Sequence, residues 1–333
     1  MINLAMLSCG HVHTKGYCEA IAQRDDCRLA VVWDDMPERG AKFAETYGAE
    51  FSKDLPDTVA RTDIAGFIIC AENTRHLPLL EAAVPAGKPI FCEKPFTTTV
   101  ADAQQAMAAI RKHNTSVFMG YFQPFSAELR GIIRLLEDGS LGTVTHAKYR
   151  NAHHAAYGRW FDSPDNRWFT DPALAGGGAF MDMGTHAVHA IRTLLGPVDR
   201  VWAQISNVSG EYPDVDDYGI AHLDFASGAA GVVEASWVQT GGITGLEITG
   251  SKATVYRLPD RSYVWAEPKQ TPKPVEPAEP KPTQVARLVA AINGELTEDE
   301  LAHDLAAAAD AVAIMEACYQ SSQSGSWVDV PKV

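Results

Sequence analysis

The sequence lacks several features that mark special classes of protein. It contains no run of lysine or arginine and no apolar stretch long enough to span a membrane. Its formal charge at pH 7 is −14, because 42 acidic residues outnumber 28 basic ones. Nucleic acids and anionic membranes bind basic surfaces, so we expect neither as a partner. The chain has no Cys-x-x-Cys pair and opens without a signal-peptide pattern, so we expect a cytoplasmic protein with reduced thiols.

What the sequence does contain is typical of a globular enzyme. Hydrophobic residues make up 46% and charged residues 21% of the 333 residues. A chain of this length has enough residues for two domains with a core each. The regular alternation of short apolar runs with helical patterns ends at residue 121, so we place the domain boundary between residues 121 and 122.

The first part of the chain alternates short apolar runs with helical patterns. Strands are expected at 2–8, 28–33, 64–70, 89–92 and 116–121. Helices are expected between them at 14–24, 38–47, 76–86 and 100–113, and a short strand and helix at 51–61. Strands that alternate with helices of this length predict a parallel, doubly wound sheet, which is an α/β domain of the Rossmann type.

The second part of the chain is mostly of β character. Strands are expected at 144–151, 201–208, 220–225, 229–238, 246–249, 253–257 and 327–330. Helices are expected at 126–137, 179–195, 283–293 and 301–321, and the proline-rich stretch 267–282 is expected to be a surface excursion. This pattern predicts an α+β domain with a large, mostly antiparallel open sheet.

The turn after the first strand carries an incomplete dinucleotide motif. The pattern Gly-x-Gly-x-x-Gly would fall on residues 8–13, where only the middle glycine, Gly10, is present. That glycine lets the backbone approach a pyrophosphate, and Asp34 follows at the end of the second strand, where a carboxylate binds a ribose hydroxyl. Asp35 comes next, and two carboxylates would repel a 2′-phosphate. We therefore expect NAD as cofactor in preference to NADP.

The same turn contains the sequence His11-Val12-His13, which admits another interpretation. Two histidines one residue apart can bind a metal, as in metal-dependent hydrolases built on barrels of eight strands and helices. Such a site needs further ligands, and His76, His153 and His154 are available. The chain shows no succession of eight such units. We therefore expect His11 and His13 to donate hydrogen bonds in the phosphate cleft, and we expect no metal.

Two groups of residues are candidates for acid–base chemistry. Lys94 follows the strand expected at 89–92, in the segment Glu93-Lys94-Pro95, and open α/β sheets bind ligands at the carboxyl ends of their strands. Asp182 and His186 are spaced four residues apart in the helix expected at 179–195, so both project from one helix face. A buried histidine beside an acid is the structural alternative for this pair.

A loop between residues 152 and 169 is rich in aromatic and basic residues. Aromatic faces stack on sugar rings and arginines bind carboxylates or hydroxyls, so the loop is a candidate substrate site, with a subunit contact as the alternative. The candidates for substrate contacts are His153, Arg159, Trp160 and Trp168 of this loop together with Tyr121.

Several short motifs together resemble one known family. They are Asp34 with Pro37-Glu38-Arg39, the segments 71–73 and 86–89, Glu93-Lys94-Pro95, Gly176-Gly177-Gly178-Ala179 and Asp182-Met183-Gly184-Thr185-His186. On these residues the chain resembles the Gfo/Idh/MocA oxidoreductases, which include glucose–fructose oxidoreductase and inositol dehydrogenase, over nearly its whole length. It departs from them in the glycine turn and at residues 120–124, where many relatives carry Asn-Arg-Arg.

The resemblance implies a function and roles for the candidate residues. It implies an NAD-dependent dehydrogenase that acts on a secondary alcohol of a sugar, inositol or sugar acid. Lys94 would bind the reacting oxygen, His186 would accept the alcohol proton, and Asp182 would orient His186 or bind a hydroxyl. The residues implied in binding the cofactor are Gly10, His11, Val12, Asp34, Asp35, Ala71, Asn73, His76 and Glu93.

The expected organisation follows from the same resemblance. Residues 1–121 would bind the dinucleotide, and residues 122–333 would bind the substrate and form a homodimer or homotetramer through the C-terminal sheet, with the C-terminal helices packing back on the first domain. Three alternatives to the dehydrogenase stay open. They are a redox-neutral lyase or epimerase with retained NAD, a non-catalytic binding protein, and a metal-dependent hydrolase.

Overall fold

The computed structural model describes residues 1–282 and 284–333. Its contacts divide the chain into two compact units of three segments each. Unit 1 comprises Met1–Gly120, Ser163–Trp168 and Pro282–Ala309, and unit 2 comprises Tyr121–Asp162, Phe169–Lys281 and Asp310–Val333. The expected start of a helix at residue 283 lies outside the described residues. No helix in the described part of the chain is long and apolar enough to cross a membrane.

Unit 1 is built on a parallel sheet. Its strands are β1 (Ile2–Leu7), β2 (Cys27–Trp33), β3 (Glu50–Ser52), β4 (Gly66–Ile69), β5 (Ile90–Cys92) and β6 (Val117–Met119). They lie in the order β3-β2-β1-β4-β5-β6, and neighbouring strands run parallel. The strands β4, β5 and β6 are buried throughout, as expected where helices cover both faces of a sheet. The doubly wound fold predicted from the sequence is confirmed.

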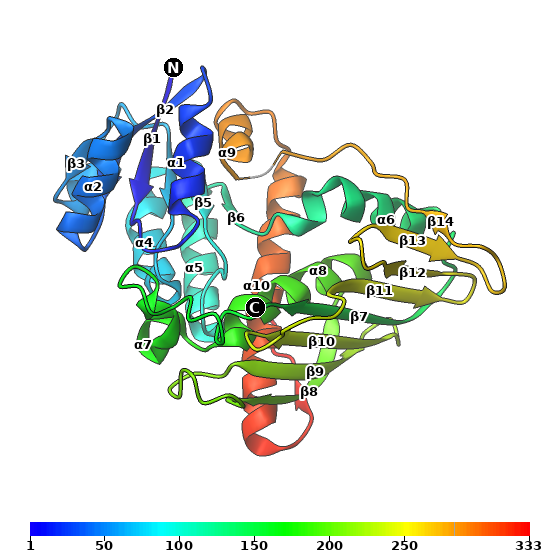
Figure 1. Ribbon diagram of the computed structural model, residues 1–333. Helices are drawn as coiled ribbons and strands as arrows, with labels where there is room; N and C mark the ends of the chain where they lie inside the picture. Colours follow the sequence, from blue (N-terminus) through cyan, green and yellow to red (C-terminus); the bar gives the residue numbers. More distant parts are fainter. Residues whose placement is uncertain (283) are drawn as a thin grey trace. The chain divides into compact units, whose positions relative to one another are not determined.

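Helices flank this sheet (Figure 1). They are α1 (Thr14–Ala22), α2 (Pro37–Tyr47), α3 (Leu55–Ala60), α4 (His76–Ala83), α5 (Val100–His113) and α9 (Gln284–Ile292). Met6, Phe91 and Phe118 of the sheet pack in one buried cluster with Tyr17 of α1 and Leu288 of α9. The helix α9, which is distant in the sequence, therefore shares a face of the sheet with α1.

Unit 2 contains a second, larger sheet. Its strands are β7 (Val144–Ala152), β8 (Val198–Ser206), β9 (Tyr218–Phe225), β10 (Ala230–Ser236), β11 (Gly245–Gly250), β12 (Thr254–Arg257), β13 (Tyr263–Ala266), β14 (Lys273–Pro274) and β15 (Val328–Asp329). Their order is β14-β13-β12-β11-β7-β10-β9-β8-β15. Within the described residues, β7 and β10 pair in parallel and the other neighbours pair antiparallel. The predicted mostly antiparallel open sheet is confirmed.

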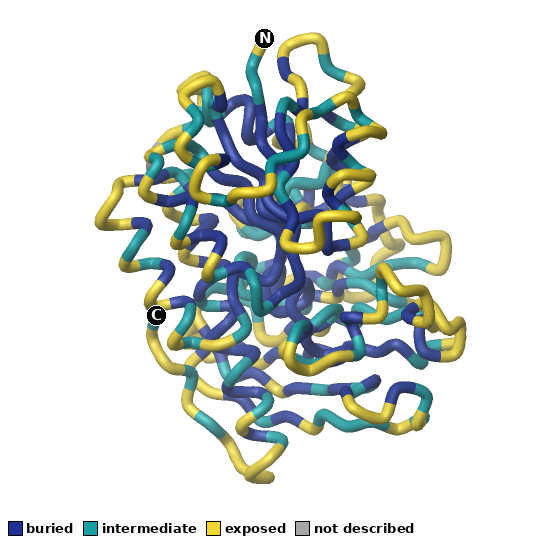
Figure 2. The backbone as a smooth tube through the Cα atoms, turned by 90° about the vertical axis from the view of Figure 1, so that its left-hand side faces the viewer, coloured by how far each residue is buried: buried dark blue, intermediate teal, exposed yellow. Residues whose placement is uncertain are grey.

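One face of this second sheet carries the core of unit 2. The helices α6 (Ala127–Glu137), α8 (Thr185–Leu195) and the end of α10 (Glu298–Ser324) contribute Ile132, Val188 and Ile314 to a cluster that includes Val233 of β10. Figure 2 colours the backbone by burial, and along β9 every second residue is buried. Burial on one face only follows from the period of two residues along a strand.

Two segments of unit 2 differ from the sequence prediction. The region expected as one helix at 179–195 begins with a π-helical turn, Phe180–Gly184, before α8 starts at Thr185. The proline-rich stretch 267–282 contributes the short edge strand β14, which pairs with the unpredicted strand β13. Proline is tolerated in an edge strand because one side of such a strand makes no ladder bonds.

Candidate active site

Lys94 lies at the carboxyl end of β5, where the backbone leaves the sheet of unit 1. Its exposed fraction is 3%, and Glu93 beside it is fully buried. The Glu93 carboxylate accepts the backbone N–H of Lys94 at 2.6 Å. His76 of α4 lies between two backbone oxygens, with Nδ1 at 2.7 Å from the oxygen of Pro95 and Nε2 at 3.2 Å from the oxygen of Ala71. These contacts hold the segment that carries Lys94 against the ends of β4 and β5.

Glu93 is the centre of a buried polar cluster. Its Oε1 lies 2.8 Å from Nδ1 of His13 and accepts a short hydrogen bond from the hydroxyl of Tyr17. Burial raises the pKa of Glu93, but the charges of His11, His13 and Lys94 and the bond from His13 lower it more, so the pKa lies well below its ordinary value. Glu93 is therefore a buried carboxylate whose negative charge is stabilised by the positive charge of the neighbouring Lys94.

The glycine turn between β1 and α1 fits the role expected of Gly10. A Cβ built on Gly10 would lie 2.7 Å from the carboxylate of Glu72, so a side chain at this position would have to displace that carboxylate. Ser8, which replaces the first glycine of the motif, has a positive φ of 70°. The indole Nε1 of Trp168 donates to the backbone oxygen of Gly10 at 2.9 Å. Trp168, which the sequence suggested as a substrate contact, is thus placed against the turn inside unit 1.

Asp34 lies in the position expected for a ribose ligand, at the end of β2. Its carboxylate accepts the backbone N–H groups of Cys9 at 2.6 Å and Met36 at 2.7 Å. Gly10 and Asp34 thus stand at the carboxyl ends of neighbouring parallel strands, which is where such a sheet binds a dinucleotide. On these observations the residues of unit 1 fit NAD.

The acidic groups at this edge of the sheet are paired. Arg39 contacts Asp34 at 2.9 Å, Asp35 at 3.2 Å and Glu72 at 2.8 Å, and Arg75 also contacts Asp35. The preference for NAD expected from the sequence rests on the negative charges of Asp34 and Asp35 alone. The structure adds Glu72 and two guanidinium groups, so repulsion of a 2′-phosphate is weaker than two bare carboxylates would make it.

Asp182 and His186 lie in unit 2, at the π-helical turn and the start of α8. The Asp182 carboxylate accepts the indole N–H of Trp237 at 3.0 Å, and Trp237 is fully buried. The ring of His186 packs edge-on against Tyr121, with centroids 5.9 Å apart. The Tyr121 hydroxyl lies 2.6 Å from the hydroxyl of Thr185. Single-turn π-helices occur often at functional sites, because they change the direction of the side chains on a helix.

The part of the aromatic loop that lies in unit 2 is held by ring contacts and ion pairs. The ring of Trp160 lies 4.8 Å from that of His153, and 46% of its surface is exposed. Arg159 forms ion pairs with Asp162 and Glu211 at 2.9 and 2.7 Å. The loop thus presents an exposed tryptophan, while the guanidinium of Arg159 is already engaged by carboxylates.

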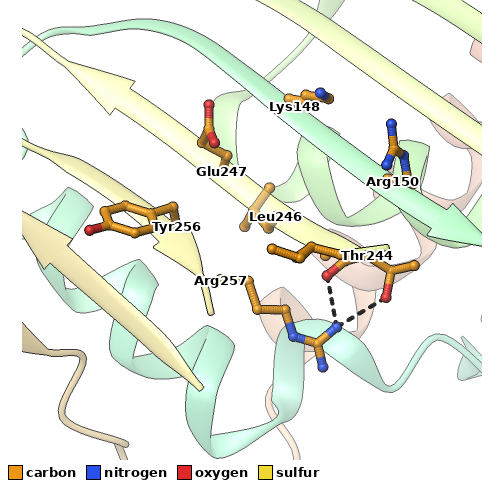
Figure 3. Close-up of a pocket in the computed structure, with 9 residues that line it drawn as sticks. Lys148, Arg150, Thr244, Leu246, Glu247, Tyr256 and Arg257 are labelled. Atoms are coloured by element: carbon orange, nitrogen blue, oxygen red, sulfur yellow. Dashed lines mark hydrogen bonds between the residues drawn. The ribbon is translucent and has the colours of Figure 1, made fainter. Parts of the chain in front are cut away.

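A hollow on the sheet of unit 2 contains residues that the sequence did not single out (Figure 3). Lys148 and Glu247 line it from neighbouring strands, together with Arg257 of β12. Figure 3 shows Arg257 reaching Thr244, whose backbone oxygen and hydroxyl accept from Nη1 at 3.0 and 3.3 Å.

Other residues missed from the sequence are Tyr17, Arg39, Glu72 and Trp237. Of these, Glu72 and Arg39 fall within motifs quoted for the family, which is the signal that could have drawn attention to them.

Comparison with known proteins agrees with this architecture. The model of an oxidoreductase family with an NAD-binding Rossmann fold matches residues 2–121, and the model of the GFO/IDH/MocA C-terminal domain matches residues 129–256. The uncharacterized oxidoreductase YrbE of Bacillus subtilis (strain 168) is 26% identical over 228 residues, which cover 67% of this chain and 63% of that protein.

Two further similarities extend the comparison. The inositol 2-dehydrogenase of Rhizobium meliloti (strain 1021) is 26% identical over 260 residues, which cover 76% of this chain and 74% of that protein. The solved structure of levoglucosan dehydrogenase in complex with NADH and levoglucosan has a TM-score of 0.83 at 22% identity and covers 99% of this chain and 100% of that chain. Because the two family models together match more than half of its residues, the chain belongs to the GFO/IDH/MocA family of oxidoreductases, with an NAD-binding Rossmann domain at its N-terminus.

Proposed function

We propose that the protein is an NAD(H)-dependent dehydrogenase that transfers hydride between nicotinamide and a secondary alcohol of a sugar, inositol or sugar acid. The observation that carries the proposal is the buried Lys94 at the carboxyl end of β5, whose backbone N–H is bound by the buried Glu93 carboxylate. Relatives named inositol 2-dehydrogenase and levoglucosan dehydrogenase support this substrate class.

The residues of the chain have distinct roles in this proposal. Bound NAD would supply the acceptor for the hydride. Gly10, Val12 and Asp34 would hold it, with Asp35, Ala71, Asn73, His76 and Glu93 around them. Lys94 hydrogen-bonds the reacting oxygen, and its charge stabilises the negative charge that develops there as hydride leaves.

Proton transfer is assigned to unit 2. His186 accepts the alcohol proton at a ring nitrogen, since an imidazole titrates near the working pH. Asp182, held by the indole N–H of Trp237 at 3.0 Å, orients His186 or a neighbouring hydroxyl of the substrate. Tyr121, His153, Arg159, Trp160 and Trp168 are proposed as the substrate contacts.

The test is replacement of Lys94 by alanine. A panel of polyols, aldoses and sugar acids is first screened with NAD and with NADP, and turnover is read from the absorbance of the reduced cofactor. With the best substrate, Lys94→Ala should lower kcat by about 100-fold or more, because the developing charge loses its partner. The affinity for NAD, measured by calorimetry, should change little.

The control is Lys112→Ala, at an exposed position in the last turn of α5. It should keep both kcat and NAD affinity. Near-normal turnover by Lys94→Ala would contradict the proposal. NAD that stays bound through purification, with product formed and no net NADH, would instead indicate a redox-neutral reaction.

We also propose that the chain forms a cytoplasmic homodimer or homotetramer through the outer face of the sheet in unit 2. Trp202, His222, Val232, Lys148 and Glu247 lie opposite one another in a row across this face. The row combines apolar area with charges of both signs, which suits contact with a second copy of the same face.

The mass in solution tests this proposal. Light scattering should give a multiple of 36.0 kDa for the natural sequence. Val232→Glu should shift the protein towards the monomer, since it places a carboxylate at the centre of the face. Lys42→Glu, at an exposed position of α2, serves as the control and should leave the mass in solution unchanged. A monomeric natural protein, or an unchanged mass of Val232→Glu, would count against this interface.

A further inference from the structure

The turn after β1 and the end of β5 bring together two histidines and a carboxylate. Each of His11, His13 and Glu93 offers a possible ligand atom, and these three atoms lie within 4.8 Å of one another. The sequence pointed to His11-x-His13 as half of a metal site but suggested only later histidines as partners. The fold supplies the third ligand from Glu93 instead, which is 80 residues away from His13 in the sequence.

The spacing of these atoms suits an ion with ligands near right angles. Nδ1 of His13 and Oε1 of Glu93 are 2.8 Å apart. With metal–ligand bonds of about 2.1 Å, this separation subtends about 84° at the ion, close to the octahedral angle. Opposite ligands of such an ion stand about 4.2 Å apart, so three atoms that lie within 4.8 Å of one another need to move together by at most about 0.6 Å.

Hydrogen bonds from neighbouring groups orient the Glu93 carboxylate, as they do for carboxylates that bind metals in proteins. Glu93 is fully buried, and its two oxygens accept from the backbone N–H of Lys94 at 2.6 Å and from the hydroxyl of Tyr17. A carboxylate has about four acceptor positions, so these two donors orient it, and the position on Oε1 that now faces Nδ1 of His13 can be taken by an ion.

The two histidines differ in burial, and the difference gives the site a route to solvent. His11 is 2% exposed, whereas 39% of the His13 side chain is exposed. Nδ1 of His11 accepts the backbone N–H of His13 at 3.2 Å, which is a long hydrogen bond. Ligation through Nε2 needs the tautomer with the proton on Nδ1, so it replaces this long hydrogen bond.

We propose that His11, His13 and Glu93 bind one divalent transition-metal ion. Two imidazoles and one carboxylate are the ligand set that such ions favour, whereas Mg²⁺ and Ca²⁺ prefer sites made of oxygen alone. The ion would join the start of α1 to the end of β5 and would offset the buried charge of Glu93. The inference departs from the expectation of no metal and does not depend on the proposed dehydrogenase activity.

Cobalt(II) provides a direct test. The full-length protein is treated with a chelator, passed through a desalting column and titrated with Co²⁺, with binding followed by calorimetry and by visible absorption. One equivalent should bind and raise the melting temperature, since an ion that binds only the folded state stabilises it. His13→Ala and Glu93→Gln should each weaken binding by about 100-fold or more, because each removes a direct ligand.

His13→Ala is the decisive variant, because His13 is half-exposed and its loss should leave the fold, checked by circular dichroism, intact. The control is His146→Ala, at an exposed position of β7, which should bind Co²⁺ as the natural sequence does. Absence of stoichiometric binding, or equal affinity of His13→Ala and the natural sequence, would overturn the proposal. The cluster would then be a hydrogen-bonded His–Glu–Tyr group that needs no ion.

Discussion

Trp237 shows how a single donor can control a candidate catalytic group. Its indole N–H bonds the Asp182 carboxylate at 3.0 Å, and its side chain is fully buried. Trp237→Phe keeps an aromatic ring but removes this donor. We expect kcat to fall about 10-fold, within the range for loss of an outer hydrogen-bond partner, and the free energy of unfolding to fall by about 1–3 kcal/mol.

Steady-state kinetics and thermal melts measure these two effects separately. The matched control is Trp202→Phe, which makes the same replacement at a partly exposed position on the outer face of the sheet. It should leave kcat unchanged. If Trp237→Phe loses stability but keeps its kcat within twofold, the bond is structural and Asp182 needs no such orientation.

Among the polar residues around Gly10, one could be predicted from the sequence and its ion-pair partner could not. Asp34 was assigned from its position after an apolar strand, and the structure places it at the end of β2 as expected. Its partner Arg39 could not be derived in the same way, because an arginine at the start of a helix reads as a solvated residue. The pairing depends on the approach of α2 to the end of β4, which brings Glu72 to the same guanidinium.

At the scale of elements, the start of the π-helical turn depends on one glycine. A Cβ on Gly178 would lie 1.9 Å from the backbone oxygen of Asp216, and the backbone cannot yield as a flexible side chain can. The Asp216 carboxylate also accepts the N–H groups of Gly178 at 2.8 Å and Phe180 at 2.7 Å. These bonds satisfy backbone donors that a helix start leaves unpaired.

We therefore expect Gly178→Ala to lower the free energy of unfolding by about 3 kcal/mol or more, because the clash displaces Asp216 from both donors. Chemical denaturation, followed by circular dichroism, measures this loss in the free energy of unfolding. Gly16→Ala in α1 is the control, since nothing lies within 4 Å of a Cβ at that position. Alanine there should raise the free energy of unfolding by about 0.5–1 kcal/mol. Similar values for the two variants would contradict the steric argument.

Element boundaries were predicted well where local signals are strong. The helix α5 covers Val100–His113 as expected, because Thr99 caps its first turn and Asn114 ends it in a left-handed conformation. The strands β13 and β14 were missed, because each is short and the second contains a proline. They exist because β12 offers them an edge to pair with.

At the scale of the whole molecule, a buried ion pair joins distant segments of unit 1. Asp304 of α10 lies 3.0 Å from Nη1 of Arg287 in α9 and accepts the backbone N–H of Met119 in β6 at 3.1 Å. Burial raises the pKa of Asp304 above its ordinary value despite the nearby guanidinium. The protonated form is therefore favoured by folding, and this contribution to stability is lost as pH rises through the raised pKa.

Removing the cation should make this pH dependence visible. Arg287→Met leaves the Asp304 carboxylate buried without its cation, and we expect a loss of about 3–5 kcal/mol at pH 8. At pH 5 the loss should be smaller, because protonation of Asp304 removes the buried charge. Urea unfolding at both pH values measures the difference.

The double variant Arg287→Met/Asp304→Leu supplies the control. It removes both charges, so it should recover part of the stability at pH 8 and show less dependence on pH than the single variant. An equal loss for Arg287→Met at both pH values would show that packing of the arginine stem, rather than the pairing of charges, stabilises this junction.

By itself the sequence determined the two fold classes and the position of the strand-end residues. Alternation of apolar runs with helical spacing is a local property, and a parallel sheet places the residue after each strand at one edge. That is why Gly10, Asp34 and Lys94 could be selected in advance, while their assigned roles and the domain boundary at 121 stay predictions.

Only the tertiary structure decided which side chains meet at that edge. The contacts of Glu93 with His13 and Tyr17, and of Arg39 with Asp34 and Glu72, join residues far apart in the sequence. Such pairings depend on the packing of α1 and α2 against the sheet, and no local pattern encodes them. The physical reason is that periodicity fixes which face of an element is buried, whereas the neighbours it meets there are set by how the elements pack.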